Sequence, residues 1–208
     1  NPDLIEDKIT NRTRAIMVVH TMGKPCDMDK IMEIAKKYNL YVIEDSCEAH
    51  GAKYKDNYIG SFGDVAAFSF FVAHVISAGD GGMVSTNRRD ISDIVQSLKI
   101  HGRELSSDYF NHVRHASNFR MNILPACIGL PELNRFWEIF KERKENLYYL
   151  LEKVKDLKEF AIFNLEEPYE TTSPHAFSLT LKDLKYNYKE LYKFMEANSI
   201  RVKRNFGA

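Results

Sequence analysis

The first half of the chain alternates between short apolar runs and segments with helical spacing. Residues 15–20 (AIMVVH) form an apolar run that predicts a buried β-strand. Asp27 is a favourable N-cap, and the apolar side chains after it recur at helical spacing as far as residue 38. A second apolar run at residues 40–43 (LYVI) leads into Glu44 and Asp45. A strand, a helix and a strand in this order predict a βαβ unit, in which the two strands are parallel.

Further periodic segments continue as far as residue 154. We expect a hairpin-like excursion, two more strands and two helices, at residues 53–63, 66–71, 83–85, 88–100 and 122–154. Residues 101–117 are rich in His, Arg and Asp and predict a loop. Together these elements predict an α/β fold with a mostly parallel sheet flanked by helices.

The composition changes after residue 154. Three strands around one helix are expected, with the strands at residues 160–163, 175–181 and 200–203 and the helix at residues 188–198. We therefore assign residues 1–154 to a large α/β domain with its following long helix, and residues 155–208 to part of a small C-terminal α+β domain. Because the pattern starts and stops without a terminal element, we expect the chain to lack N- and C-terminal parts of its fold.

Charge and cysteine content exclude several classes of partner. The chain has 29 basic and 29 acidic residues, so it lacks the positive field that nucleic-acid binding requires. Its three cysteines are far apart and form no C-x-x-C pair, which argues against a zinc site or a disulfide framework. No apolar run reaches the ~18 residues that a membrane span needs. We expect a cytoplasmic protein with no membrane partner.

Polar residues gather where two of the expected strands end. The segment EDSCEAHG follows the strand at residues 40–43, and the strand at residues 66–71 leads into VAH and then GDGG. In an open α/β sheet, ligands bind at the carboxyl ends of the parallel strands. We therefore expect the chemistry of the protein at this edge of the sheet.

Four motifs in this region resemble those of a known enzyme family. In chain order they are EDSCEAHGA, FGDVAAFSFF, GDGGMV and NFRMN. Their order and spacing are similar to those of the sugar aminotransferase/dehydratase family of fold-type I enzymes, which depend on pyridoxal 5'-phosphate (PLP) or pyridoxamine 5'-phosphate (PMP). The resemblance extends over most of the chain. It implies the fold-type I architecture, a PLP or PMP cofactor and a nucleotide-linked sugar as substrate.

The resemblance assigns four cofactor-binding residues. Asp45 matches the aspartate that binds the pyridinium nitrogen, and a carboxylate there would keep that nitrogen protonated. Glu48 stands where most of the aminotransferases carry a glutamine that bonds the cofactor hydroxyl. Ser69 matches the serine on the cofactor phosphate. Asn118 matches an asparagine that reaches the phosphate in the neighbouring subunit, which implies a homodimer. Taken singly, these residue types also occur as ordinary capping, strand or loop residues.

His74 departs from the aminotransferase pattern and is the candidate catalytic residue. The family's aminotransferases carry, five residues after the serine, the lysine that bonds covalently to PLP; here the sequence is SFFVAH, and no lysine occurs between Lys55 and Lys99. An imidazole forms no such stable bond, so the cofactor would be held as PMP. Its ordinary pKa of about 6.5 suits proton transfer at neutral pH. The competing interpretation is a packed histidine in a protein that has lost its catalytic function.

A histidine at this position is the hallmark of the NDP-4-keto-6-deoxyhexose 3-dehydratases within the family. The implied reaction is dehydration at C3 of a nucleotide-linked 4-keto-6-deoxyhexose, giving a 3-deoxy sugar for surface polysaccharides or natural products. No cysteine lies between Cys47 and Cys127, so the chain looks unlike the iron–sulfur group and more like the colitose-pathway type, in which glutamate regenerates PMP. Two alternatives remain: a nucleotide-sugar aminotransferase, and an inert protein that binds nucleotide sugars.

Overall fold

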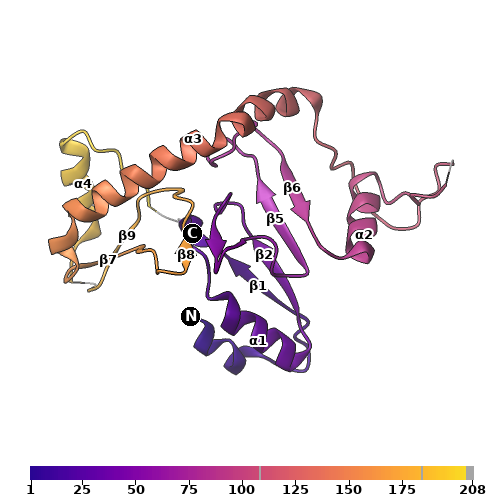
Figure 1. Cartoon of the computed structure of the whole chain (residues 1–208), viewed down its shortest axis with the longest axis horizontal. Helices are drawn as coiled ribbons and strands as arrows, with labels where there is room; N and C mark the ends of the chain where they lie inside the picture. The colour runs from indigo at the N-terminus through magenta and orange to yellow at the C-terminus, as the bar shows by residue number, and fades with distance from the viewer. Residues whose placement is uncertain (108, 184, 205–208) are drawn as a thin grey trace.

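The centre of the molecule is a four-stranded sheet in the order β1-β2-β5-β6. The computed structural model describes residues 1–107, 109–183 and 185–204. Strands β1 (Ala15–Val19), β2 (Tyr41–Asp45) and β5 (Val65–Ser69) run parallel, and β6 (Gly82–Ser85) runs antiparallel to β5. Figure 1 shows this sheet between the long helix α3 and the N-terminal helix α1. The predicted βαβ unit and the mostly parallel sheet are confirmed.

Helix α1 (Met28–Tyr38) connects the first two strands. The carboxylate of its N-cap, Asp27, accepts a hydrogen bond from the backbone N–H of Lys30, and its C-cap is Asn39, whose φ of 52° is left-handed. Its buried side chains Met28, Ile31, Ile34 and Ala35 lie on one face, as their spacing predicts. Three of these, all but Ile34, join the main core with Val18 and Val42.

A small second sheet joins two distant parts of the chain. Strands β3 (Lys53–Tyr54) and β4 (Asn57–Tyr58) form the predicted hairpin. On its other edge, β3 pairs antiparallel with β8 (Glu170–Thr171). The segment that follows β8 is thereby brought next to the central sheet, which matters for the site described below.

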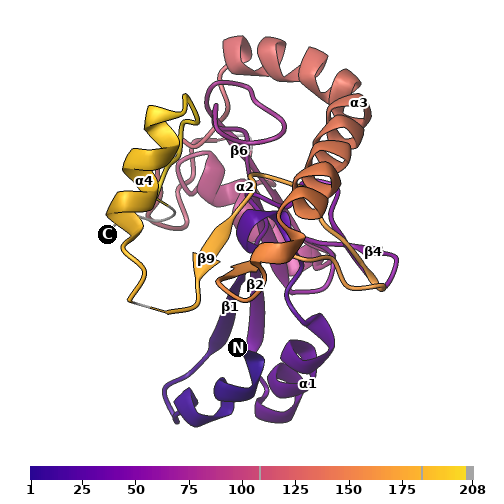
Figure 2. The ribbon, with the colours of Figure 1, turned by 90° about the vertical axis from the view of Figure 1, so that its left-hand side faces the viewer.

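Helix α3 (Ile123–Lys153) is the longest element and follows α2 (Arg89–Lys99) and the intervening loop. Asn122 caps it by accepting a hydrogen bond from the N–H of Leu124. Figure 2 shows the helix bending in its first half. Pro131 lies inside it and lacks the N–H that would continue the hydrogen-bond ladder, which explains a bend. Short 3₁₀ turns complete the helical elements, at Pro2–Leu4, Glu6–Lys8, Thr21–Gly23 and Lys155–Leu157.

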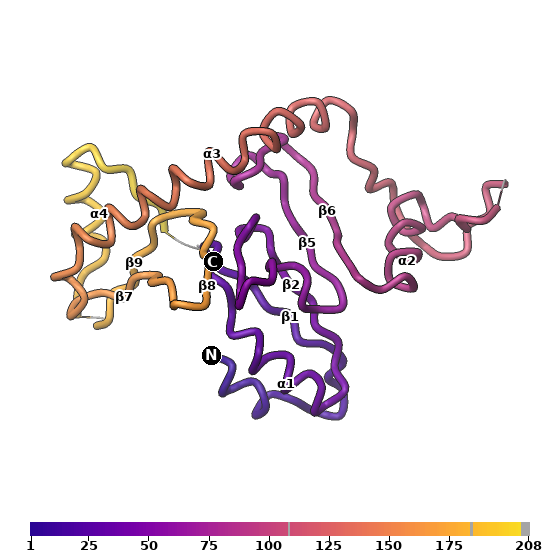
Figure 3. The backbone as a smooth tube through the Cα atoms, in the orientation of Figure 1, coloured from indigo at the N-terminus to yellow at the C-terminus, as the bar shows by residue number. Residues whose placement is uncertain are grey.

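Two of the three strands predicted for the last part of the chain are present. β7 (Ala161–Phe163) pairs with β9 (Leu179–Leu181), and α4 (Tyr188–Ala197) follows. The prediction of a strand at residues 200–203 was wrong; in the part of the chain that the structure describes, these residues pair with no other strand. The strand expected from residue 175 starts only at residue 179, because the segment before it is bonded to the turn at residues 22–23. Figure 3 traces this segment from β8 to β9.

Among the described residues, none of the helices is both long enough and apolar enough to cross a bilayer.

Candidate functional site

The predicted polar residues lie at the carboxyl ends of β2 and β5, which are neighbours in the sheet. Asp45 is the last residue of β2 and pairs with Ala67 of β5. Its Oδ1 accepts a hydrogen bond from the N–H of Cys47 at 3.1 Å. Ser69 is the last residue of β5, and its Oγ accepts from the N–H of Phe71 at 3.2 Å. The structure therefore places Asp45 and Ser69 at one edge of the sheet, on adjacent strands.

A tight loop after β5 positions His74. The N–H of Phe70 donates to the carbonyl of Gly81 at 2.9 Å, and the N–H of Ala78 donates to the carbonyl of Phe70 at 2.8 Å. The loop therefore folds back over the end of the strand. Gly79 and Gly81 have φ values of 81° and 115°, a conformation that glycine adopts without strain. Inside this loop, the N–H of His74 donates to the carbonyl of Phe71 at 2.9 Å.

His74 is half-buried and lies beside two other imidazoles. Its ring centroid lies 6.4 Å from that of His50 and 5.3 Å from that of His175. Its Nδ1 is buried and has no hydrogen-bond partner among the described residues. Burial lowers the pKa of His74, while the carboxylates of Glu48 and Asp45 oppose that shift. A neutral imidazole in this position can accept a proton.

His50 is almost fully buried, with 4% of its surface exposed. Its ring lies against Phe68 and Phe70, at centroid distances of 5.5 and 6.0 Å. Neither ring nitrogen has a partner within the described part of the chain. Burial lowers the pKa of His50 to about 4, helped by the neighbouring His74 and His175. The side chain is therefore closed off from solvent.

Glu48 links the turn after β1 to a residue from the far end of the chain. Its Oε2 accepts a hydrogen bond from the N–H of Met22 at 2.5 Å, and its Oε1 lies 3.5 Å from Nε2 of His175. Sequence reasoning missed His175, which it placed at the start of a strand. No local pattern marks this histidine, because its place in the site depends on the pairing of β8 with β3.

Cys47 lies between Asp45 and Glu48 in the sequence, but its thiol does not act as a nucleophile. Burial raises the pKa of its thiol to about 12, and Asp45 adds to the shift. The thiolate is the reactive form of cysteine, so this side chain stays protonated and unreactive at neutral pH.

Asn118 lies apart from these residues. Its exposed side chain accepts hydrogen bonds from the N–H and the Nε of Arg120, at 3.3 and 2.9 Å. Within the described residues, no hydrogen bond connects Asn118 to Asp45, Ser69 or His74. Its predicted role in a neighbouring subunit's site remains a prediction.

A family comparison accounts for this arrangement. The model of the DegT/DnrJ/EryC1/StrS aminotransferase family matches residues 1–208. The chain belongs to this family. The predicted family resemblance and fold type are confirmed, and so is pyridoxal phosphate as the cofactor of the family.

Three relatives show the range of the family. A GDP-perosamine synthase of Escherichia coli O157:H7 is 45% identical over 141 residues, which cover 68% of this chain and 38% of that protein. An aminotransferase from Psychrobacter cryohalolentis has a similar structure, with a TM-score of 0.88, 27% identity, and 96% of this chain and 56% of that chain covered. The structure of the E. coli GDP-4-keto-6-deoxy-D-mannose-3-dehydratase with bound hydrated PLP is also similar. Its TM-score is 0.87 at 26% identity, and 97% of this chain and 55% of that chain are covered.

The chain therefore spans only about half the length of the DegT/DnrJ/EryC1/StrS proteins that it matches. The names of these relatives include both an aminotransferase and a 3-dehydratase.

The residues at the sheet edge fit the cofactor of the family. A carboxylate suits a protonated pyridine nitrogen, and a hydroxyl on adjacent backbone suits a phosphate. Asp45 and Ser69 supply these two groups from neighbouring strand ends.

Proposed function

We propose that this chain forms part of an enzyme that uses PMP to dehydrate a nucleotide-linked 4-keto-6-deoxyhexose at C3. One observation carries the proposal: an imidazole, His74, stands at the sheet edge where the family's aminotransferases carry a lysine. Its ring lies beside that of His175, which in turn faces the carboxylate of Glu48. Its loop follows β5, the strand that pairs with β2 and its last residue Asp45. The similarity to a solved 3-dehydratase over 97% of the chain supports the same assignment.

The cofactor, when bound, supplies an amine for the ketone of the sugar and a protonated ring that takes up an electron pair. Asp45 holds the proton on the ring nitrogen, because a carboxylate beside a pyridine favours its charged form. Ser69 would bind the phosphate through its hydroxyl, and Asn118 from a second copy of the chain would bind the same phosphate. The enzyme is therefore a homodimer in this proposal.

His74 would take a proton from the methylene carbon of bound PMP. Burial keeps its imidazole neutral at neutral pH, so it can act as a base. We assign the reaction to Nε2, because Nδ1 is buried within the protein. The same nitrogen then carries the proton to the departing C3 hydroxyl, which leaves as water. Glu48 bonds the cofactor hydroxyl from the neighbouring loop.

The second candidate is a nucleotide-sugar aminotransferase. It is favoured by the similarity to the aminotransferase from Psychrobacter cryohalolentis. Against it, the stretch from residue 56 to residue 98 contains no primary amine to replace the missing lysine. The two activities differ in the fate of the amino nitrogen, which an aminotransferase leaves on the sugar and a dehydratase releases as ammonia.

Nitrogen tracing decides between the two activities. The complete protein, loaded with PMP, is incubated with a nucleotide-linked 4-keto-6-deoxyhexose and ¹⁵N-glutamate. We expect ¹⁵N-ammonia and a sugar that has lost the C3 hydroxyl and contains no ¹⁵N. A ¹⁵N-amino sugar would establish the aminotransferase instead. Turnover of neither kind, in protein shown to bind PMP, would indicate the inert sugar-binding protein.

A further inference from the structure

The pair Glu48–His175 joins the two ends of the chain at the candidate site. The imidazole Nε2 and the carboxylate Oε1 are 3.5 Å apart, and both side chains are largely buried, with 15% and 14% of their surfaces exposed. The ring of His175 also lies beside that of His74, at a centroid distance of 5.3 Å. His175 therefore lies next to both the candidate base, His74, and the carboxylate of Glu48.

The backbone of residues 173–175 is bonded to the turn at residues 22–23. The N–H of Met22 in this turn donates a hydrogen bond to Glu48. The N–H of Ser173 donates to the carbonyl of Gly23 at 3.0 Å, and that of His175 to the carbonyl of Met22 at 3.4 Å. Gly23 has a φ of 77°, and a Cβ on it would lie 1.6 Å from the carbonyl oxygen of Ser173. Only glycine allows this approach, so the turn and the His175 segment fit each other closely.

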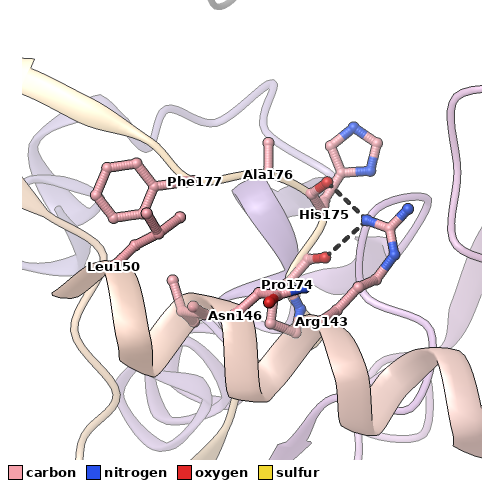
Figure 4. Close-up of a pocket in the computed structure, with 8 residues that line it drawn as sticks. Arg143, Asn146, Leu150, Pro174, His175, Ala176 and Phe177 are labelled. Carbon is pink, nitrogen blue, oxygen red and sulfur yellow. Dashed lines mark hydrogen bonds between the residues drawn. The ribbon is translucent and has the colours of Figure 1, made fainter. Parts of the chain in front are cut away.

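Arg143 of α3 holds the same segment from the other side. Its Nη1 donates to the carbonyl oxygens of Pro174 and His175, at 3.1 and 3.0 Å. Figure 4 shows these two bonds and the imidazole of His175 projecting beyond the guanidinium. The hollow of about 140 Å³ in this view lies between α3 and residues 174–177. The backbone of His175 is thus fixed by two separate elements, and its side chain has little freedom to leave Glu48.

We propose that His175 is a positioning residue, whose imidazole orients the carboxylate of Glu48 and packs beside the ring of His74. This inference rests on the proposed function and adds a residue to it. Glu48 then presents one fixed oxygen to the cofactor hydroxyl. The ring of His175 beside His74 also limits the orientations open to the His74 imidazole.

The charge state of the pair follows from the groups around His175. Burial lowers its pKa and Glu48 opposes that shift, whereas His74, Arg143 and Lys203 disfavour its charged form further. At neutral pH, His175 is thus neutral, with its Nε2 3.5 Å from Oε1 of Glu48. A neutral donor orients the carboxylate without adding a second positive charge beside His74.

A titration that needs no turnover tests the pair. The pKa values of the histidines are measured by NMR in the complete protein, labelled at histidine Cε1, without substrate. In Glu48→Gln we expect a lower pKa for His175, because the carboxylate that raises it has gone. An unchanged His175 pKa in Glu48→Gln would overturn the inference, whether or not the protein proves to be a dehydratase.

A double-mutant cycle tests the consequence for catalysis. His175→Phe keeps a ring of similar size but removes the donor, and we expect kcat to fall on the order of tenfold to 100-fold with little change in KM, the scale set by a misplaced catalytic group. His175→Gln keeps an amide donor and should retain more of the activity. Adding Glu48→Gln to His175→Phe should cause little further loss, because the two residues act as a unit.

The controls separate this inference from the proposed function. The far-ultraviolet circular dichroism and PMP affinity of each variant show whether it folds and loads. Independent, multiplicative effects of Glu48→Gln and His175→Phe on kcat, in folded and loaded protein, would refute the coupling. If the parent protein releases amino sugar rather than ammonia, the proposed reaction fails, while the titration still decides the role of His175.

Discussion

Replacing Gly23 by alanine probes the contact that holds the His175 segment against the site. At this position two penalties add. The left-handed φ of 77° costs an L-residue about 1–2 kcal/mol, and the new Cβ would lie 1.6 Å from the carbonyl oxygen of Ser173. Overpacking in a fitted region costs about 1–3 kcal/mol more, because the backbone must shift. We expect Gly23→Ala to lower the free energy of unfolding by about 2–5 kcal/mol.

Gly79→Ala is a matched control for the backbone penalty. Gly79 has a nearly identical φ of 81°, yet no atom lies within 4 Å of a Cβ built on it. Its alanine variant should therefore show only the conformational part, about 1–2 kcal/mol. The difference between the two variants isolates the contact with Ser173.

Urea unfolding of both variants, followed by circular dichroism, measures the two free energies. If Gly23→Ala and Gly79→Ala were equally destabilised, the turn at residues 22–23 would not be packed against residues 173–175 as described. The shift of Ser173 should also displace His175 relative to the charged groups around it and so change its pKa. A Gly23→Ala variant that kept the parent's His175 pKa would therefore contradict the argument as well.

Three further predictions concern other parts of the molecule. Burial raises the pKa of Glu44, but hydrogen bonds from His20 and from backbone N–H groups more than offset this, so its pKa lies below the ordinary 4.5. The stability that ionised Glu44 contributes is therefore present above pH 4.5 and is lost as the pH falls through the lower pKa of the folded state. Urea unfolding between neutral and acid pH should show Glu44→Gln destabilised and less pH-dependent than the parent, while the exposed Glu33→Gln should match the parent. If Asn118 serves its partner's site, a mixed dimer of Asn118→Ala and His74→Asn subunits has one intact site, and mixing the two variants should restore about a quarter to a half of the parent activity. No recovery in verified mixed dimers would place Asn118 in its own subunit's site. Arg143→Met should lower the free energy of unfolding by about 2–4 kcal/mol, because two hydrogen bonds from a charged donor are lost, and a change within 0.5 kcal/mol in urea unfolding would show that the two bonds do not hold the segment.

The elements that the sequence predicts well are those that a local period defines. Residues 15–19, 28–38 and 41–45 form the predicted strand, helix and strand, because each buries one regular set of apolar side chains. The neighbouring positions of Asp45 and Ser69 follow from the same pattern. Parallel strands end on one side of a sheet, so residues at their carboxyl ends meet without any long-range information.

The parts that failed depend on distant partners. Residues 200–203 carry a strand-like composition, yet the hydroxyl of Tyr192 bonds the carbonyl of Val202, and no strand lies beside them in the described part of the chain. His175 was missed for a related reason. Its neighbours in sequence predict a strand, whereas β8 pairs with β3 and delivers it to Glu48. Pairings between distant strands leave no periodic signal in either segment.

The three-dimensional position of His175 gives a reason for a glutamate at residue 48. An amide at this position would offer the cofactor either its oxygen or its nitrogen, and a neighbouring donor would be needed to choose between them. A carboxylate is an acceptor at both oxygens; here one accepts from Met22, and the other lies 3.5 Å from Nε2 of His175. Its negative charge also lies near His74 and favours the imidazolium that forms when His74 takes a proton, which partly compensates for the burial that keeps His74 neutral beforehand. Glu48 therefore suits a site whose base is a histidine, and Glu48→Gln should lower the pKa of His74 as well as that of His175. A His74 pKa that rises in Glu48→Gln would show that the carboxylate does not face the base.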